Sequence, residues 1–460
     1  MKKTITFLLV AVFTSVLSAQ TVSIQGGSTY GTITEAITAA VAGDVILISG
    51  VFTEPITISK SITLRGTNPA TDIIQAAAAP SSDGTGVRAV TLTGSGTPIA
   101  PLTITIENLG IKNGNTSSAL NGGGIFIDKI TGLATLKNLI IEKNYSGRNG
   151  GGISIDGSNA NIIECTIMNN SALTNGGGIM IAANNAAAID CTINIKQSLI
   201  NSNTVGNGGG IYINAANSTT YKIALNIENS TISNNVANSA STANGGGAIF
   251  SQNGTTSGLA TLKLVHTTVY NNSHVALIKA GIQFAGTAGS VTNFSAYNSI
   301  IVGNDDVTAT GLKAINFTNT NTTNIVNCIL GGTTLPPTIV SDPVPNANNN
   351  EAGKTATYAG LSAVLTSAGG STQVLQITAG GKAENYCTVA TPGVTIPTID
   401  QRGYLRAGIQ DAGAYELGGT LSLNDNKMYK NSSVAISPNP TQGSVTISGL
   451  DTIKVVRVYS

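Results

Sequence analysis

Two aspartates at matching places in neighbouring repeats have the spacing that best fits metal or acid–base chemistry. Asp128 ends the stretch GGGIFID, and Asp156 ends the stretch GGGISID. If these stretches stack as neighbouring strands, the two carboxylates lie about 4.8 Å apart. Repulsion at that distance raises the pKa of one carboxyl or recruits a cation such as Ca²⁺. Asp128 and Asp156 are therefore the candidate metal residues, and Ca²⁺ is the only cofactor considered.

A structural explanation of the same aspartates is favoured. Asp156 precedes Gly157, and Asp-Gly is a common turn pair. The matching positions in later repeats are expected at Ala182, Asn214 and Ser251, whereas a calcium site needs about six or more oxygen ligands. Turn formation is therefore preferred over metal binding, and no catalytic residue is assigned.

Three further chemistry-bearing features are also assigned structural roles. Asp305 and Asp306 form an acidic pair, but the Gly-His-Gly and Arg-x-Lys sequences expected with such a pair in one class of polysaccharide hydrolases do not follow, so an acidic turn is favoured. His266 occupies a place where other repeats carry Asn, Gln or Glu, which predicts that it joins a polar ladder. His274, the second of the two histidines, carries no clear signal.

These residues belong to a repeat of about 30 residues. A glycine cluster recurs at Asn121–Ile125, Asn149–Ile153, Asn175–Ile179 and Asn207–Ile211, which read NGGGI, and at Asn244–Ala248, which reads NGGGA. A second signature is six residues long: its third residue is Ile or Val and its sixth is Asn. The apolar third residue, here called central, recurs at 111, 141, 167, 200, 232, 269, 301 and 329. Alternating apolar residues indicate short strands within each repeat. The sequence therefore predicts an all-β parallel β-helix solenoid.

The glycine cluster has a structural explanation in such a solenoid. Glycine adopts φ > 0 without steric penalty, which allows a sharp turn into the next strand. The Asn ahead of the glycines is expected to stack on the Asn of the next coil and to form hydrogen bonds in both directions. A phosphate-binding loop would be followed by a helix and usually a Lys, whereas a strand pattern follows here.

Composition and cysteine spacing exclude several classes of protein. Charged residues make up 10% of the chain and the net charge is +1, so no nucleic-acid partner is expected. Cys165, Cys191, Cys328 and Cys387 lack the spacing of a metal site. Cys165 and Cys328 are expected to be small buried core residues.

The N-terminus has the form of a signal peptide. Lys2 and Lys3 precede an apolar run over residues 5–17, and the small residues Ser18 and Ala19 follow. Residues 1–19 are therefore expected to be removed. The mature protein is expected to be a monomer, extracellular or on the outer cell surface.

A helix over about residues 32–42 is predicted to cover the open N-terminal end of the solenoid. Thr32 and Glu35 have the spacing of a capping box, and Ile33 and Ile37 fall on one apolar face. Gly43 is expected to end the helix.

This cap, the following stretch AGDVILISGVFTEPITISKSITLRG and the NGGGI coils together resemble right-handed parallel β-helix proteins of the pectin-lyase-like class. The coils are most similar to polymorphic-outer-membrane-type repeats. The resemblance covers residues 21–332 and implies a capped β-helix domain over residues 20–332. Because this fold carries many functions, the resemblance does not fix an activity.

The rest of the chain carries two further resemblances. Residues 333–420 are expected to hold terminal coils and a closing segment, because DQRGYLRAGIQDAGAYE resembles a closing motif of secreted bacterial β-helices. Its charged residues are expected to pair as ions that lock the last coil, with catalysis as the less favoured alternative; they are Asp400, Arg402, Arg406, Asp411 and Glu416.

Residues 421–460 are expected to form a linker and the start of a small β-sandwich. The stretch PNPTQG followed by strand patterns resembles the type-A C-terminal sorting domain of type IX secretion. The resemblance implies the type IX machinery as a partner. Such domains continue for several more strands, which predicts that the domain is incomplete at Ser460.

Two classes of function remain from the sequence. The favoured class is a non-catalytic surface protein, adhesin-like, structural or glycan-binding, whose partner is an extracellular glycan or surface component. Near-uniform coils and low charge favour it. The alternative is a carbohydrate-active enzyme, a polysaccharide lyase or a glycoside hydrolase.

Overall fold

A computed structural model describes residues 20–183, 189–216, 220–238, 245–253, 260–275, 281–286, 292–304, 314–317, 321–332, 348–421, 435–437 and 446–448. The expected signal peptide, Asn244, Asp305, Asp306, residues 333–347 and the PNPTQG stretch lie outside these ranges. The chain divides into two compact units, Met1–Gly419 and Thr420–Ser460. In the second unit, β41 covers Thr420–Leu421, and β42 (Ala435–Ser437) pairs antiparallel with β43 (Thr446–Ser448). No helix in the described ranges is long and apolar enough to span a membrane.

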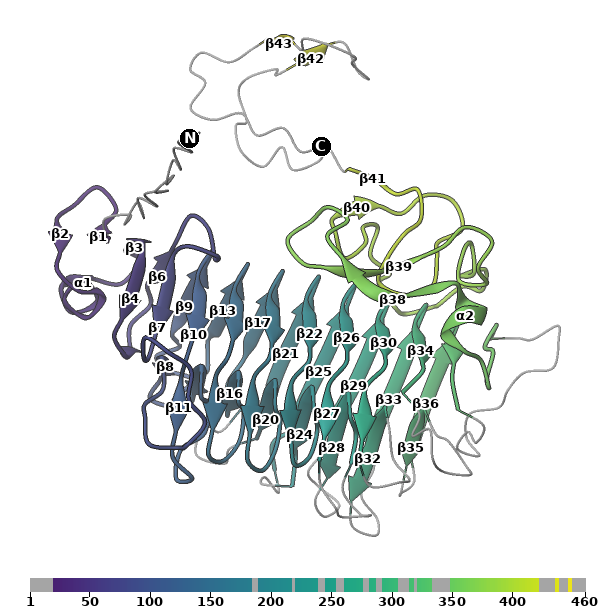
Figure 1. Ribbon diagram of the computed structural model, residues 1–460, viewed down its shortest axis with the longest axis horizontal. Helices are drawn as coiled ribbons and strands as arrows, with labels where there is room; N and C mark the ends of the chain where they lie inside the picture. Colours follow the sequence, from purple (N-terminus) through teal and green to yellow (C-terminus); the bar gives the residue numbers. More distant parts are fainter. Residues whose placement is uncertain are drawn as a thin grey trace, which may run out of the picture. The chain divides into compact units, whose positions relative to one another are not determined.

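Four sheets, here called A to D, make up most of the first unit (Figure 1). Sheet A contains β1 (Thr21–Ile24), β2 (Thr29–Tyr30), β3 (Val45–Ser49), β6 (Thr63–Arg65), β9 (Thr103–Glu107), β13 (Leu133–Lys137), β17 (Ala160–Ile163), β21 (Cys191–Lys196), β25 (Ile223–Glu228), β29 (Ala260–Val265), β33 (Thr292–Tyr297) and β36 (Asn321–Val326). Sheet B contains β4 (Val51–Thr53), β7 (Ile73–Gln75), β10 (Gly110–Lys112), β14 (Ile140–Glu142), β18 (Thr166–Met168), β22 (Leu199–Asn201), β26 (Thr231–Ser233), β30 (Thr268–Tyr270), β34 (Ile300–Val302) and β37 (Ile329–Leu330).

The other two sheets complete each coil. Sheet C contains β5 (Ile56–Ile58), β8 (Val90–Thr93), β12 (Ile125–Asp128), β16 (Ile153–Asp156), β20 (Ile179–Ala182), β24 (Ile211–Asn214), β28 (Ile249–Asn253), β32 (Ile282–Gly286) and β35 (Ile315–Phe317). Sheet D contains the short strands β11 (Asn115–Thr116), β15 (Tyr145–Ser146), β19 (Ser171–Ala172), β23 (Thr204–Val205), β27 (Val236–Ala237) and β31 (Ser273–His274). A complete coil runs through sheets A, B, D and C in that order, and coils pair in parallel. The predicted parallel β-helix is therefore confirmed.

The strand register follows the predicted column of central apolar residues, with one correction. Ile141 pairs with Ile111 on one side and with Ile167 on the other, and all three are fully buried. A buried Ile side chain contributes roughly 1.5–3 kcal/mol to stability. At the end of the column Ile301 pairs with Leu330, so Ile329 is not the eighth central residue. The adjacent apolar residues Ile329 and Leu330 made the position ambiguous in the sequence.

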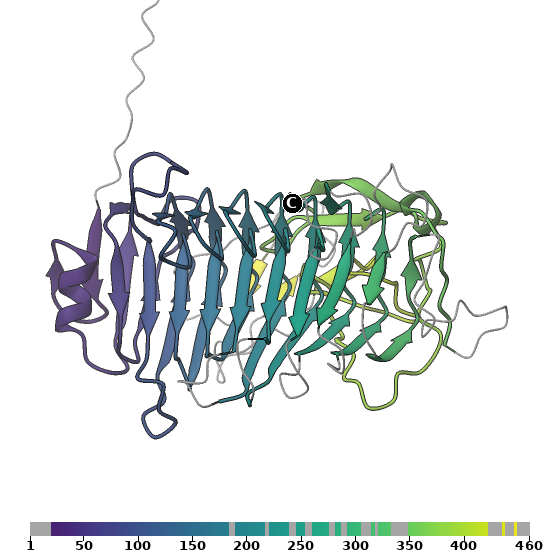
Figure 2. The ribbon, with the colours of Figure 1, turned by 90° about the horizontal axis from the view of Figure 1, so that it is seen from below.

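A short helix covers the first coil, as predicted (Figure 2). Helix α1 spans Ile33–Ala39, which is shorter than the expected range of 32–42. Thr32 and Glu35 form the predicted capping box. The helix ends at Ala39, and Gly43 adopts a φ of +97° in the turn before β3 instead of ending the helix.

The NGGGI clusters form the turns and the amide ladder that the sequence predicts. The first glycine of each copy has a positive φ, for example +69° at Gly150. The Asn149 Nδ2 donates to Asn121 Oδ1 at 3.0 Å, the Asn175 Nδ2 to Asn149 Oδ1 at 2.9 Å and the Asn207 Nδ2 to Asn175 Oδ1 at 3.0 Å. We call these four asparagines the outer ladder.

The fifth glycine cluster does not continue the outer ladder. Ile211 pairs with Ile249, so Gly245 stands at the asparagine position and Ala248 at that of the third glycine. The sequence alignment on Asn244 was therefore wrong by one residue. As a result, the buried Oδ1 of Asn207 has no protein partner in the described part of the chain.

A second amide ladder lies deeper inside the coils, at the last position of the six-residue signature. We call it the inner ladder. Each Nδ2 donates to the Oδ1 of the next coil at 2.8–3.0 Å, through Asn144, Asn170, Asn203, Asn235, Asn272 and Asn304. Backbone N–H groups also donate to these oxygens, as from Asn144 to Asn170 at 3.1 Å. The asparagine of the signature is therefore explained by satisfaction of buried polar groups.

The closing segment, residues 348–419, folds back along the flank of the solenoid (Figure 1). It first extends the last coil, where the Leu330 N–H donates to the Glu351 carbonyl at 2.7 Å. It then forms α2 (Ala356–Ala359), the antiparallel pair β38 (Leu361–Thr366) and β39 (Val374–Ile377), and β40 (Tyr404–Leu405). Buried apolar residues of this segment pack against Ile300 and Ile329 of sheet B.

The cysteines agree with their predicted role. Cys165 and Cys328 are free and fully buried, and burial raises the pKa of each thiol to about 12. Cys191 is also buried, and Cys387 is half-buried. Cys165 and Cys328 therefore act as small core residues.

Candidate functional site

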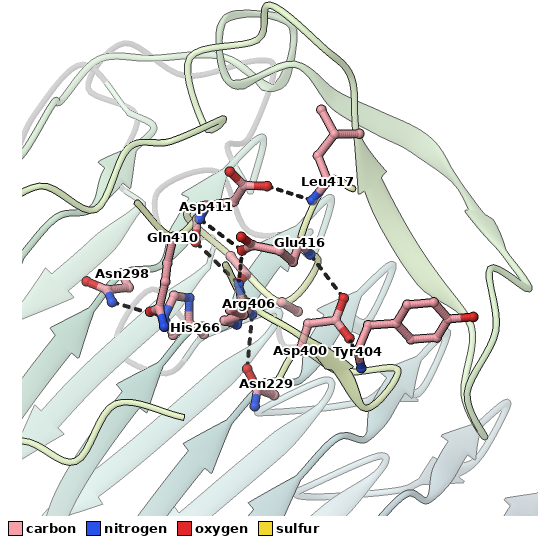
Figure 3. A network of polar contacts seen from close by, with 12 residues as sticks. Asn229, His266, Asn298, Asp400, Tyr404, Arg406, Gln410, Asp411, Glu416 and Leu417 are labelled. Atoms are coloured by element: carbon pink, nitrogen blue, oxygen red, sulfur yellow. Dashed lines mark hydrogen bonds and ion pairs between the residues drawn. The ribbon is translucent and has the colours of Figure 1, made fainter. Parts of the chain in front are cut away.

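The predicted ion pairs of the closing segment form, but not on the last coil (Figure 3). Arg406 Nη1 lies 2.9 Å from Glu416 Oε2, and Arg402 Nη2 lies 2.7 Å from Asp400 Oδ2. Arg406 also donates to Asn229 Oδ1 at 3.1 Å, in the middle of the solenoid. The expected location was wrong because contacts between such distant residues leave no local pattern in the sequence.

Asp411 differs from the other charged residues of this cluster. Its carboxylate accepts hydrogen bonds from the backbone N–H groups of Asn385 at 2.7 Å and Leu417 at 2.6 Å. Burial raises the pKa of Asp411 and that of Glu416, although hydrogen bonds and Arg406 oppose the shift. The cluster is buried and joins backbone segments, so we assign it a structural role.

His266 belongs to a polar turn column, as predicted. It adopts a φ of +45°, and its Nε2 lies 3.0 Å from Asn298 Nδ2 and 2.8 Å from Gln410 Oε1. Burial, with a contribution from Arg406, holds the pKa of His266 well below its ordinary value. The ring is fully buried, and this environment favours its neutral form. His274 is also buried, in β31 of sheet D beside Ala237.

A pair of substitutions tests this role of His266. We expect His266→Asn to lower the free energy of unfolding by less than half as much as His266→Val. Asn tolerates the left-handed backbone and keeps a hydrogen-bonding group, whereas β-branched Val tolerates neither this φ nor the buried polar partners. Urea denaturation midpoints provide the measurement. Equal losses would contradict the ladder role.

An open hollow on the outer face of sheet C is the best candidate for a binding site. Its volume is about 390 Å³. The residues that line it are mostly polar and come from neighbouring coils: Asn121, Arg148, Asn149, Ser154, Asp156, Thr174, Asn175, Met180, Ala182 and Asn214. The outer ladder forms one wall, and outward-facing residues of β16, β20 and β24 line the rest. Stacking of coils therefore builds this concave surface.

The two predicted aspartates lie in register at one side of this hollow. Asp128 pairs with Asp156 across β12 and β16, and Asp156 lines the hollow. Asp128 lies 3.6 Å from Lys129 Nζ. Burial raises the pKa of Asp128, and the charges of Lys129 and Arg88 oppose that shift. Two cationic side chains thus lie close enough to Asp128 to favour its charged form.

The residues that occupy the equivalent position in the next coils match the prediction only in part. Ala182 and Asn214 occupy the expected positions, but the next is Gln252, not Ser251. This one-residue error in the alignment has the same origin as the error at the fifth glycine cluster. Across the part of the chain that the structure describes, no group of three or more His, Cys, Asp or Glu residues is placed to hold a metal ion.

Two arginines beside the outer ladder were missed in the sequence, and Arg148 is the one that lines the hollow. Arg148 is exposed, and no ion pair of its guanidinium is found among the described residues. Arg88 lies over the Phe126 ring, 4.7 Å from its centroid, and donates to the carbonyl of Gly122 at 2.9 Å. Arg148 directly precedes an NGGGI copy. Its position in the sequence could therefore have predicted that it lies beside the outer ladder.

The chain was compared with known proteins. No protein-family model matches it, and no curated protein matches its sequence.

Proposed function

We propose that this protein is an exported β-helix that binds an extracellular glycan in the hollow of sheet C, without catalysis. The observation that carries the proposal is the open polar hollow of about 390 Å³. This volume lies within the range of about 300–1,000 Å³ that is typical of small-ligand sites. The low overall charge agrees with a ligand recognised mainly through hydrogen bonds.

The lining suits the hydroxyl groups of a sugar. Asparagine amides of the outer ladder offer donors and acceptors at intervals of one strand spacing, about 4.8 Å. Arg148 and Asp156 both line the hollow, so that the guanidinium can donate to a hydroxyl and the carboxylate can accept from one. A chain of hydroxyl-bearing units running along the solenoid would meet the same groups in successive coils.

Substitutions at the hollow test this function. We expect Arg148→Ala and Asp156→Asn each to weaken binding about tenfold, or about 1.4 kcal/mol, because each removes a charge-assisted hydrogen bond. Binding of the full chain to a panel of acidic and neutral polysaccharides, followed by calorimetry on the best one, gives the measurement. Lys137→Ala, at an exposed position in β13, is the control and should bind normally. Binding that is unaffected by both hollow variants would refute the proposed site.

A carbohydrate-active enzyme is the second candidate, because one observation favours it. Burial raises the pKa of Asp128, which lies in register beside Asp156. Two carboxyl groups about 5–5.5 Å apart are the arrangement of retaining glycosidases. Release of new reducing ends that Asp128→Asn abolishes would favour the enzyme, and release that needs Ca²⁺ would favour a lyase.

Export and surface location belong to the same proposal. The signal-peptide-like residues 1–19 and the tail that resembles a type IX sorting domain support it. Deletion of residues 421–460 is expected to retain the protein in the periplasm of a host that has type IX secretion. Cell fractionation provides the measurement.

A further inference from the structure

We propose that Asn207 is a site of spontaneous deamidation, and that the same reaction is suppressed at the three preceding NGGGI copies. All four copies share the sequence Asn-Gly-Gly-Gly-Ile. Asn-Gly is the pair in which ring closure onto the side chain is least hindered, because glycine has no Cβ. The structure places the four pairs in different surroundings, since the outer ladder ends at Asn207.

The attacking nitrogen at the last copy differs from the other three in its hydrogen bonding within the described residues. The Gly122 N–H donates to the Asn149 carbonyl at 2.8 Å, and the corresponding distances are 2.9 Å from Gly150 to Asn175 and 2.9 Å from Gly176 to Asn207. No such bond of the Gly208 N–H is found among the described residues, where Gly245 replaces the next asparagine. The amide that must lose its proton and attack is therefore hydrogen-bonded in three copies, and in the fourth it has no partner among the residues that the structure describes.

The amide oxygen of the side chain under attack also has no protein partner among the described residues at the last copy, whereas those of Asn121, Asn149 and Asn175 each accept a hydrogen bond. Asn149 and Asn175 each donate to one neighbour and accept from the other. Asn207 donates to Asn175 Oδ1 at 3.0 Å and to the Thr174 carbonyl at 3.5 Å, but its own Oδ1 accepts no hydrogen bond from the part of the chain that the structure describes. Its side chain is half-buried and can therefore reach water.

The reaction needs only water and hydroxide. Hydroxide removes the proton of the Gly208 amide, and the nitrogen attacks Cγ of Asn207. A bond forms between this nitrogen and Cγ, and ammonia leaves with a proton from water. Water then opens the five-membered imide ring to Asp or to isoaspartate. No oxidant, metal or enzyme takes part.

The product would weaken the ladder from its C-terminal end. A carboxylate at position 207 has no N–H to donate to Asn175 Oδ1, which leaves that oxygen without its partner. Isoaspartate also adds a methylene to the backbone at the position where Asn207 bridges to Asn175. Asn175 then becomes the last asparagine of the outer ladder.

The experiment is peptide mapping by mass spectrometry of the full chain, incubated in mildly alkaline buffer. We expect deamidation at Asn207 to be about tenfold or more faster than at Asn121, Asn149 and Asn175, because those pairs react only after local opening. In denaturant the four rates should converge, since the sequences following each asparagine are the same. Equal native rates, or a faster rate at another of the four copies, would overturn the proposal.

A variant that adds the missing rung tests the cause. Gly245→Asn places an amide where its Nδ2 can donate to Asn207 Oδ1. We expect deamidation of Asn207 to slow, because its Oδ1 is then bonded as that of Asn175 is, while the new Asn-Gly pair at position 245 becomes the last of the ladder. Unchanged deamidation of Asn207 in a folded variant would overturn the explanation. If this variant does not fold, the comparison of the four native copies still decides the proposal.

Discussion

Arg406→Ala is expected to destabilise the docking of the closing segment by about 3–5 kcal/mol, because it leaves a buried charge without its partner. The side chain of Arg406 is fully buried, and Glu416 is 4% exposed. Arg406 donates to Glu416 Oε2, to Asn229 Oδ1 and to the carbonyls of Gly413 and Ile399. Removal of the guanidinium therefore breaks bonds within the segment and across to the solenoid.

Hydrogen exchange resolved by peptide is the measurement for this variant. We expect faster exchange over residues 356–419, with little change in the coils before residue 160. Arg65→Ala is the matched control, because Arg65 pairs with Glu107 on sheet A and is 41% exposed. Exposed pairs contribute about 0–1 kcal/mol. Equal effects of the two substitutions would show that the buried network does not hold the segment.

Gly151→Ala is expected to lower the free energy of unfolding by more than about 4 kcal/mol, an exceptional loss for one methyl group. A Cβ at this position would lie 2.3 Å from the Ser171 carbonyl oxygen and 2.5 Å from that of Gly177. Both atoms belong to the backbone of the next coil, so the coils would have to separate. Parallel strand pairing on each side opposes that movement.

Denaturation in urea with soluble yield as a second readout measures this effect. Gly27→Ala is the control, because the nearest atom to its Cβ would be 3.5 Å away and its φ is not left-handed. We expect the control to remain within about 0.5 kcal/mol of the parent. A folded Gly151→Ala protein of unchanged stability would mean that the coils adapt more easily than close packing allows.

The coil architecture could be predicted because each repeat spells out its own local structure. Ile141 and its equivalents mark the inward positions, and the asparagines mark the turns. The errors arose where side chains do not specify the register. In Asn244–Ala248 an alanine replaces a glycine in a run of glycines, and only the pairing of Ile249 with Ile211 reveals the shift.

The site was less predictable than the fold. Stacking of Asp128 beside Asp156 followed from the repeat, and the structure confirms it. The hollow itself depends on how far side chains of different coils project, and that is a property of the assembled surface. The contact of Arg406 with Asn229 joins residues far apart in the chain, and no periodic pattern connects them.

The two amide ladders have opposite polarity. In the inner ladder each N–H points to the following coil, as from Asn144 to Asn170, and the backbone N–H bound to each Oδ1 fixes that orientation. In the outer ladder each N–H points to the preceding coil, as from Asn149 to Asn121. Amide dipoles aligned in one row are therefore opposed by those of the other. In the coils that both ladders share, from Asn144 to Asn207, the axial dipole of one row therefore offsets part of that of the other.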